Sequence, residues 1–167
     1  NVAPSVFYVE VYDEKNRALG NGSGFFINSE GVAVTNYHVI EDTASAKITT
    51  IDGKVYDVTN IIAYDANLDV AIIKISKKSD SGHVVSAFPA VTMADSDNIK
   101  AGQIVYAIGS PRGLQNTISD GIISNPKQTV GDETFIQITA PISHGSSGGA
   151  LVDEYGKVLG ITSAGFE

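Results

Sequence analysis

The chain has 167 residues, enough for one substantial domain or two small packed halves, and its 43% of hydrophobic residues is ordinary for a globular protein. Its net charge of −8, with 11 scattered basic residues, argues against nucleic acid as a partner, because phosphate binding needs clustered lysines and arginines. The lack of cysteine excludes disulfides, thiolate metal sites and cysteine nucleophiles, and no apolar run is long enough to span a bilayer.

The first half of the chain predicts a series of short strands. Asn1–Ser5 shows no signal-peptide pattern and leads into Ser5–Tyr12, which is β-branched and aromatic and predicts a strand. A polar, glycine-rich break is expected over Asp13–Gly24. Asp52-Gly53 is typical of a hairpin turn, and His38–Thr43 is expected to form one helical turn. The other strands predicted in this half are Gly24–Ile27, Gly31–Asn36, Ala46–Ile51, Lys54–Thr59 and Asp69–Ile75.

A polar stretch without periodicity divides the chain into halves of similar size. Short apolar runs resume after it and predict further strands over Gln103–Gly109, Asn116–Ser124, Thr134–Thr139, Gly149–Val152 and Lys157–Ser163. Helical periodicity is nearly absent, so the expected class is all-β, as two small packed β-barrels. We expect an N-terminal barrel over residues 1–76, a connector over 77–90 and a C-terminal barrel over 91–167, together forming one domain.

The segment HGSSGGA, residues 144–150, holds the candidate nucleophile. It matches G-x-S-x-G, the nucleophile elbow of α/β-hydrolases, but that elbow needs a strand-to-helix turn and a histidine later in the chain. No histidine follows Ser147, and a strand rather than a helix follows the glycines. The remaining serine-hydrolase order is His, Asp, Ser on two β-barrels.

His38 is the best candidate for the base among the three histidines. It follows a predicted strand of the first half, whereas Ser147 lies in the second half, and clefts between two halves commonly hold active sites. His83 lies in the polar connector, where a solvated histidine is the simpler interpretation, and His144 is too close to Ser147 in the same loop. Taken alone, His38 would more simply cap a turn.

Asp69 is the candidate that orients this base. It immediately precedes the apolar run VAIIKI, so its carboxylate is expected near the interface, where a buried charge needs a partner such as an imidazole N–H. Asp65 lies in a turn and is expected to be exposed and to cap that turn.

These candidates divide the chemistry of acyl transfer among them. His38 takes the proton of Ser147 and returns it to the leaving group, while Asp69 fixes the imidazole tautomer. The N–H groups of Gly145 and Ser147 are expected to form the oxyanion hole. Ser146 is expected to be structural.

Four blocks of the sequence together resemble the trypsin-like serine proteases of the HtrA/Deg type. They are GSGFFINSEGVAVTNYHVI, DANLDVAIIKI, AIGSPRGLQNTISDGIIS and ITAPISHGSSGGALVDEYGKVLGITSAG, and the resemblance runs from about Val2 onward. Three of them carry His38, Asp69 and Ser147 in the family's order. The chain departs from the family's GNSGGP at Ser146 and Ala150, and His144 stands where proline is common.

The resemblance implies a chymotrypsin-like fold of two six-stranded β-barrels, with the last strand of the second barrel expected to be missing because the chain stops at Glu167. It also implies a protease that cleaves unfolded or misfolded polypeptides in protein quality control. Such proteins are often homotrimers and are mostly extracytoplasmic, in the periplasm, in the cell envelope or secreted. They often carry a PDZ domain, which this sequence does not show.

The same resemblance places the primary specificity pocket. One wall is expected at Ile142, Ser143 and His144, and the opposite wall at Thr162, Ser163 and Ala164. No carboxylate lies at the base, so a preference for small or medium apolar residues such as Val, Ala, Leu or Ile is expected.

Three alternatives stay open from the sequence. The first is a catalytically inactive protease fold that binds peptides, suggested by the changes beside Ser147. The second is a zinc site of His38, Asp69 and His144, which no ligand spacing supports and which leaves GSSGG unexplained. The third is an esterase with the same triad. We expect no metal and no cofactor.

Overall fold

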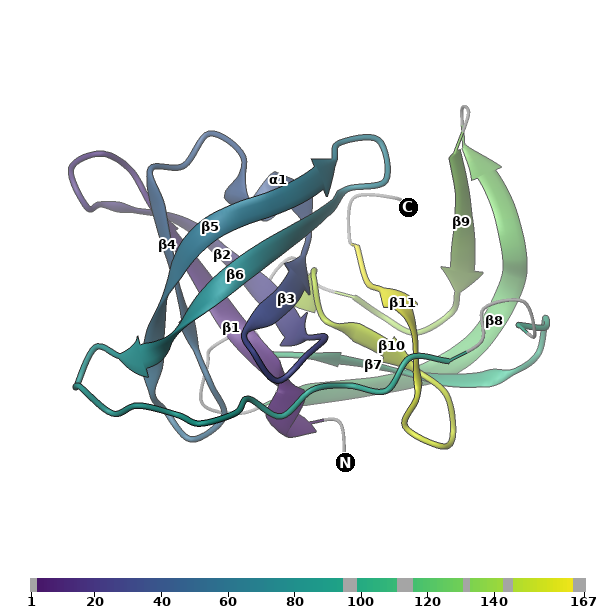
Figure 1. Ribbon diagram of the computed structural model, residues 1–167. Helices are drawn as coiled ribbons and strands as arrows, with labels where there is room; N and C mark the ends of the chain where they lie inside the picture. The colour runs from purple at the N-terminus through teal and green to yellow at the C-terminus, as the bar shows by residue number, and fades with distance from the viewer. Residues whose placement is uncertain (1–2, 95–98, 111–115, 131–132, 143–145, 164–167) are drawn as a thin grey trace.

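The computed structural model describes residues 3–94, 99–110, 116–130, 133–142 and 146–163. Over these residues the regular secondary structure is almost entirely β-sheet, with a closed barrel of six strands beside a curled sheet of five strands (Figure 1). The all-β prediction is therefore confirmed, and in the part of the chain that the structure describes the second sheet has one strand fewer than the closed barrel, consistent with the two-barrel fold predicted above. None of the described helices has the length and apolar character to cross a membrane.

The first barrel is formed by the strands of the N-terminal half, in the order β1-β2-β3-β6-β5-β4, and pairing of β4 with β1 closes it. Closure leaves no unpaired strand edge. Phe7, Phe26, Ile48 and Ile73 are fully buried inside it, and Phe88 from the connector stacks on Phe26 with ring centroids 4.3 Å apart. The elements are η1 (Ala3–Ser5), β1 (Val6–Tyr12), β2 (Ala18–Phe26), β3 (Val32–Thr35), α1 (Tyr37–Ile40), β4 (Ser45–Thr49), β5 (Val55–Asp65) and β6 (Val70–Ser79).

The second sheet has the strand order β11-β10-β7-β8-β9 and curls around its own core. Val105, Ile123, Leu151 and Leu159 are buried there. Its strands are β7 (Ile104–Gly109), β8 (Thr117–Val130), β9 (Glu133–Ile138), β10 (Ala150–Val152) and β11 (Val158–Ile161).

A separate apolar cluster joins the two sheets. Val6 and Phe25 of the first barrel pack in it with Ile108, Ala150 and Val158 of the second sheet. At this seam between the two sheets, the loop that precedes β10 and carries Ser147 lies against β2 and against Asn36, the residue that precedes α1.

The predicted break over Asp13–Gly24 is wrong, because β2 already begins at Ala18. Close packing explains two of its three glycines: a Cβ on Gly22 would lie 2.7 Å from Val39, and one on Gly24 would lie 2.5 Å from the Phe7 ring. Strand β6 also continues to Ser79, inside the stretch predicted as connector.

The hairpin predicted at Asp52-Gly53 is confirmed. Strands β4 and β5 pair as antiparallel neighbours, and the Gly53 N–H donates to the Thr50 carbonyl at 2.9 Å. Gly53 has a φ of 86°, which glycine adopts without a steric penalty.

Candidate active site

Asp69 holds the start of α1 from outside the helix. Its carbonyl accepts the N–H of Tyr37 at 3.2 Å, and its Oδ1 accepts the N–H of His38 at 2.7 Å. These two N–H groups belong to the first turn, where a helix has no internal acceptors for them. Asp69 has a φ of 58°, a left-handed conformation that aspartate tolerates better than most residues. The turn that precedes β6 is thus built to present both oxygens to α1.

The side chains of His38 and Asp69 form a direct pair. His38 Nδ1 lies 2.6 Å from Asp69 Oδ2. An ionised carboxylate only accepts hydrogen bonds, so the proton of a neutral imidazole lies on Nδ1 and the lone pair on Nε2. The His38 side chain is 43% exposed, whereas that of Asp69 is 11% exposed. The imidazole is therefore anchored on one edge and open on the other, as a general base requires.

Ser163 supplies a further hydrogen bond to this carboxylate. Its hydroxyl donates to Asp69 Oδ2 at 3.1 Å. Ser163 is predicted above in the wall of the specificity pocket, whereas in the structure its hydroxyl faces the carboxylate that holds His38. The buried charge of Asp69 is thereby compensated by donors from His38 and Ser163, which lie on opposite sides of the seam.

Ser147 lies in a loop of the second sheet and is hydrogen-bonded to the first barrel. Its carbonyl accepts the N–H of Ser23, in β2, at 2.8 Å. The next residue, Gly148, donates its N–H to the carbonyl of Thr162 at 2.8 Å. The hydroxyl of Ser147 donates to Oδ1 of Asn36, the residue that precedes α1. Ser147 therefore lies at the seam, bonded to the segment that carries His38.

Gly148 has two independent reasons to be glycine. Its φ is 96°, and a Cβ built on it would lie 2.0 Å from the Ser23 carbonyl oxygen. We expect Gly148→Ala to lower the free energy of unfolding by about 2–5 kcal/mol, since backbone strain and a steric clash add together. Urea unfolding measures the change. Gly82→Ala is the matched control, because Gly82 has a φ of 92° but no atom within 4 Å of its Cβ. Equal losses in both variants would show that the contact with Ser23 does not matter.

Part of the expected site lies outside the described residues. Gly145, proposed for the oxyanion hole, and Ser143, His144 and Ala164, expected in the pocket walls, belong to this part. The remaining expected pocket residues, Ile142 and Thr162, line the cavity described next.

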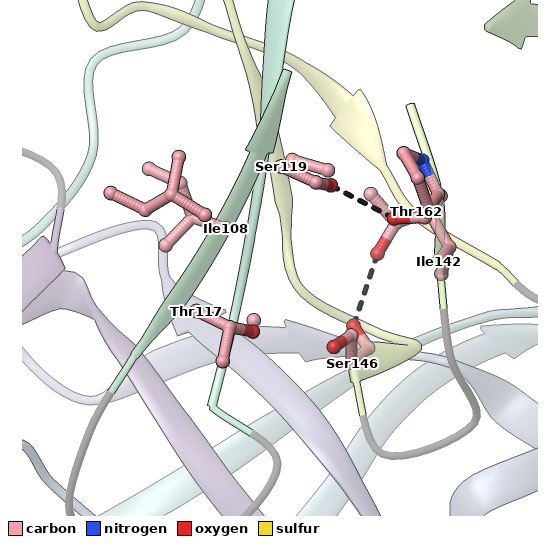
Figure 2. Close-up of a pocket in the computed structure, with 10 residues that line it drawn as sticks. Ile108, Thr117, Ser119, Ile142, Ser146 and Thr162 are labelled. Atoms are coloured by element: carbon pink, nitrogen blue, oxygen red, sulfur yellow. Dashed lines mark hydrogen bonds between the residues drawn. The ribbon is translucent and has the colours of Figure 1, made fainter. Parts of the chain in front are cut away.

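A cavity of about 280 Å³ lies beside the nucleophile loop (Figure 2). Figure 2 shows Ile142 and Thr162 on one side of it, facing residues of β7 and β8. Two hydrogen bonds tie its walls together: Thr162 Oγ1 donates to the Ser146 carbonyl at 3.2 Å, and Ser119 Oγ donates to that of Pro141 at 2.8 Å. The described residues that line it are all uncharged: Ala107, Ile108, Gly109, Thr117, Ile118, Ser119, Pro141, Ile142, Ser146 and Thr162.

An aromatic stack adjoins His38 on the first barrel. The rings of Tyr37 and Tyr64 stack with centroids 4.6 Å apart. Burial raises the pKa of the Tyr37 phenol above its usual value, and electrostatic interaction with the neighbouring Tyr64 ring and with Glu41 and Asp42 raises it further. Tyr37 is therefore neutral at physiological pH and adds no charge beside the imidazole.

Three features of the site were not predicted from the sequence: the role of the Asn36 amide, the bond from Ser163 to Asp69, and the contribution of β7 and β8 to the cavity. Asn36 stands two residues before His38, and that proximity was the only available signal. Asp65 does cap its turn as expected, accepting the N–H groups of Asn67 and Leu68 at 3.0 Å. Among the described residues, no three His, Asp or Glu side chains gather as metal ligands would.

Comparison with known proteins gives matches over almost the whole chain. Residues 22–161 match the family model described as a trypsin-like peptidase domain. Serine protease HTRA1 of Xenopus tropicalis is 33% identical over 97% of this chain. A probable periplasmic serine endoprotease, DegP-like, of Chlamydia muridarum is 39% identical over 90% of it. Anti-sigma-I factor RsgI9 of Acetivibrio thermocellus is 36% identical over 96% of it. The chain spans 36%, 29% and 22% of the lengths of these three relatives.

Proposed function

This chain belongs to the trypsin-like peptidase family, with HtrA- and DegP-type serine proteases among its relatives, and from that premise we propose that it is a serine endopeptidase whose catalytic triad is His38, Asp69 and Ser147. The observation that carries the assignment is the pair of His38 Nδ1 and Asp69 Oδ2, 2.6 Å apart on the first barrel. Ser147, from the second sheet, is hydrogen-bonded to the same barrel through Ser23. An imidazole with one edge anchored and one edge open serves a hydroxyl nucleophile in this way.

The proposed reaction proceeds through an acyl-enzyme. Ser147 Oγ attacks the carbonyl carbon of the scissile bond while His38 Nε2 takes its proton. The imidazolium, stabilised by Asp69, then protonates the leaving amine as the C–N bond breaks. Water repeats the sequence on the ester, with His38 as base, and releases the acid product and free Ser147. The N–H groups of Gly145 and Ser147 are assigned to the oxyanion formed in each half-reaction.

We assign the uncharged cavity beside Ser146 to the substrate residue on the acyl side of the cleaved bond. Ile142 and Thr162 line it, and Ser143, His144 and Ala164 stay assigned to its surroundings from the sequence, whereas the hydroxyl of Ser163 bonds to Asp69. A cavity of about 280 Å³ whose described lining holds no carboxylate suits a small or medium apolar side chain, and this part of the lining offers no partner for Lys or Arg.

A peptide library tests this assignment. We expect cleavage after Val, Ala, Leu or Ile, with neighbouring members of that set differing in kcat/KM by about 10–200-fold at most, because one methylene in an apolar pocket is worth little more. Cleavage mainly after Arg or Glu would contradict the pocket assignment, though not the triad.

The proposed physiological substrates are unfolded or misfolded polypeptides. The support is the kinship with HtrA and DegP-like proteases and the loose specificity expected of an uncharged cavity. We further propose an extracytoplasmic location, since the Chlamydia relative is described as periplasmic, and a homotrimer. Sedimentation of the purified protein distinguishes a trimer from a monomer, and proteolysis of unfolded against folded casein-like substrates tests the preference for unfolded chains.

The alternative function is a peptide-binding module without activity. One observation favours it: Ser147 has no exposed surface, and its hydroxyl is bonded to Asn36. A fluorophosphonate probe separates the two proposals, because it reacts only with an activated serine. Covalent labelling at Ser147 supports the peptidase, whereas peptide binding without any labelling supports the binding module.

A further inference from the structure

Asn36 occupies the N-cap position of α1, yet its side chain does not cap that helix. Asparagine is favoured at this position because its side-chain oxygen accepts an N–H of the first turn. Here the oxygens of Asp69 accept the N–H groups of Tyr37 and His38 instead. The amide of Asn36 is therefore not needed to cap α1, and it points across the seam toward Ser147.

The partners of this amide fix its orientation. Asn36 Nδ2 donates to the Asp69 carbonyl at 3.0 Å, and a carbonyl oxygen can only accept. The nitrogen must therefore face Asp69, which leaves Oδ1 to face Ser147. Because an amide oxygen also only accepts, the hydroxyl of Ser147 is the donor in that bond. Asn36 is fully buried, so losing either bond would leave a buried polar group unpaired.

The hydrogen bond to Asn36 uses the hydroxyl proton of Ser147, which is the proton that His38 must accept during catalysis. A serine hydroxyl has a single proton, and the amide of Asn36 holds it in this structure. His38 cannot accept that proton until the hydroxyl turns. Ser147 also has no exposed surface, so its oxygen is closed to an incoming carbonyl carbon in the same conformation.

We propose that Asn36 is a positioning residue that holds Ser147 in a resting orientation, and that acylation begins when the hydroxyl turns from Asn36 Oδ1 to His38 Nε2. The turn is a rotation about the Cα–Cβ bond of Ser147 and neither makes nor breaks a covalent bond. The proposal rests on the triad assigned above. Every reaction of Ser147 is slowed by the fraction of molecules in the resting orientation, because only the turned hydroxyl reacts.

The first test compares fluorophosphonate labelling of the wild type with that of Asn36→Ala. The alanine removes the acceptor of the Ser147 hydroxyl but leaves both bonds between His38 and Asp69 in place. We expect labelling about three- to tenfold faster than in the wild type, the factor that one neutral hydrogen bond supplies. Peptide cleavage should show the same rise in kcat with KM unchanged, a split that a merely structural role would not produce.

Thr35→Val is the matched control for loss of a buried hydrogen bond. The hydroxyl of Thr35 is fully buried and donates to the Ser23 carbonyl at 2.8 Å, one residue away from Asn36. We expect this variant to lose thermal stability as Asn36→Ala does, without faster labelling. If Asn36→Ala labels no faster than the wild type, or slows in parallel with Thr35→Val, the proposal is overturned.

Two further measurements guard against a variant that does not fold. Asn36→Ser keeps a buried hydroxyl but is too short to reach Ser147, and it should also label faster. In the wild type itself, the side-chain amide signal of Asn36 in an NMR spectrum should shift when Ser147 is labelled, and an unchanged signal would overturn the proposal. Absence of any wild-type labelling would instead refute the peptidase assignment, so the two failures are distinguishable.

Discussion

Replacing Ser147 with alanine is expected to lower kcat by about 10⁴–10⁶-fold, with KM for peptides little changed. The physical reason is that the Ser147 hydroxyl is the group assigned to form the acyl-enzyme. A residual rate above that of water should remain, since the oxyanion hole and the bound geometry still act. Casein degradation and a fluorogenic peptide measure the loss.

Ser86→Ala is the control for this variant. Ser86 is an exposed serine of the connector, so the same chemical change there should leave kcat as in the wild type. If Ser147→Ala cleaved casein at a tenth of the wild-type rate or faster, Ser147 would not be the nucleophile. If the wild type and Ser147→Ala bound peptides equally well and neither cleaved them, the result would support the binding module instead.

Replacing Asp69 with asparagine is expected to lower kcat by about 10⁴-fold while the fold stays intact. The bonds around this residue explain why. Oδ1 accepts the N–H of His38, so the oxygen of an asparagine amide must take that place. Its NH₂ group then faces His38 Nδ1 and forces that nitrogen to accept. The imidazole proton moves to Nε2, which can no longer take a proton from Ser147.

Asp65→Asn is the matched control for this change. Asp65 is exposed and accepts two backbone N–H groups in its turn, which an asparagine oxygen can also accept. Full activity is expected, with the midpoint of thermal unfolding close to that of the wild type. An Asp69→Asn variant that kept more than a tenth of the wild-type kcat would show that the tautomer of His38 is not set by Asp69.

The strands and the chain order of the candidate triad were accessible to sequence reasoning because both depend on local information. Ser5–Tyr12 carries enough β-branched and aromatic residues to specify a strand, and Val6–Tyr12 forms one as β1. The lack of a histidine after Ser147 excluded the α/β-hydrolase elbow without any coordinates. The prediction for Asp13–Gly24 was wrong because glycines lower strand propensity, whereas close packing against Val39 and Phe7 requires glycine at Gly22 and Gly24 in β2.

The amino-acid sequence by itself determined the all-β class, the hairpin at Asp52-Gly53 and the choice of His38, Asp69 and Ser147 as candidates. Only the tertiary structure decided that Asn36 holds the hydroxyl of Ser147 across 111 residues of chain and that Ser163 bonds to Asp69 across 94. The physical reason is that strand formation follows from neighbouring side chains, whereas a buried hydrogen bond finds its partner only when two sheets pack together. The packing of the two sheets against each other therefore determined that Asn36 meets Ser147 and that Asp69 meets Ser163.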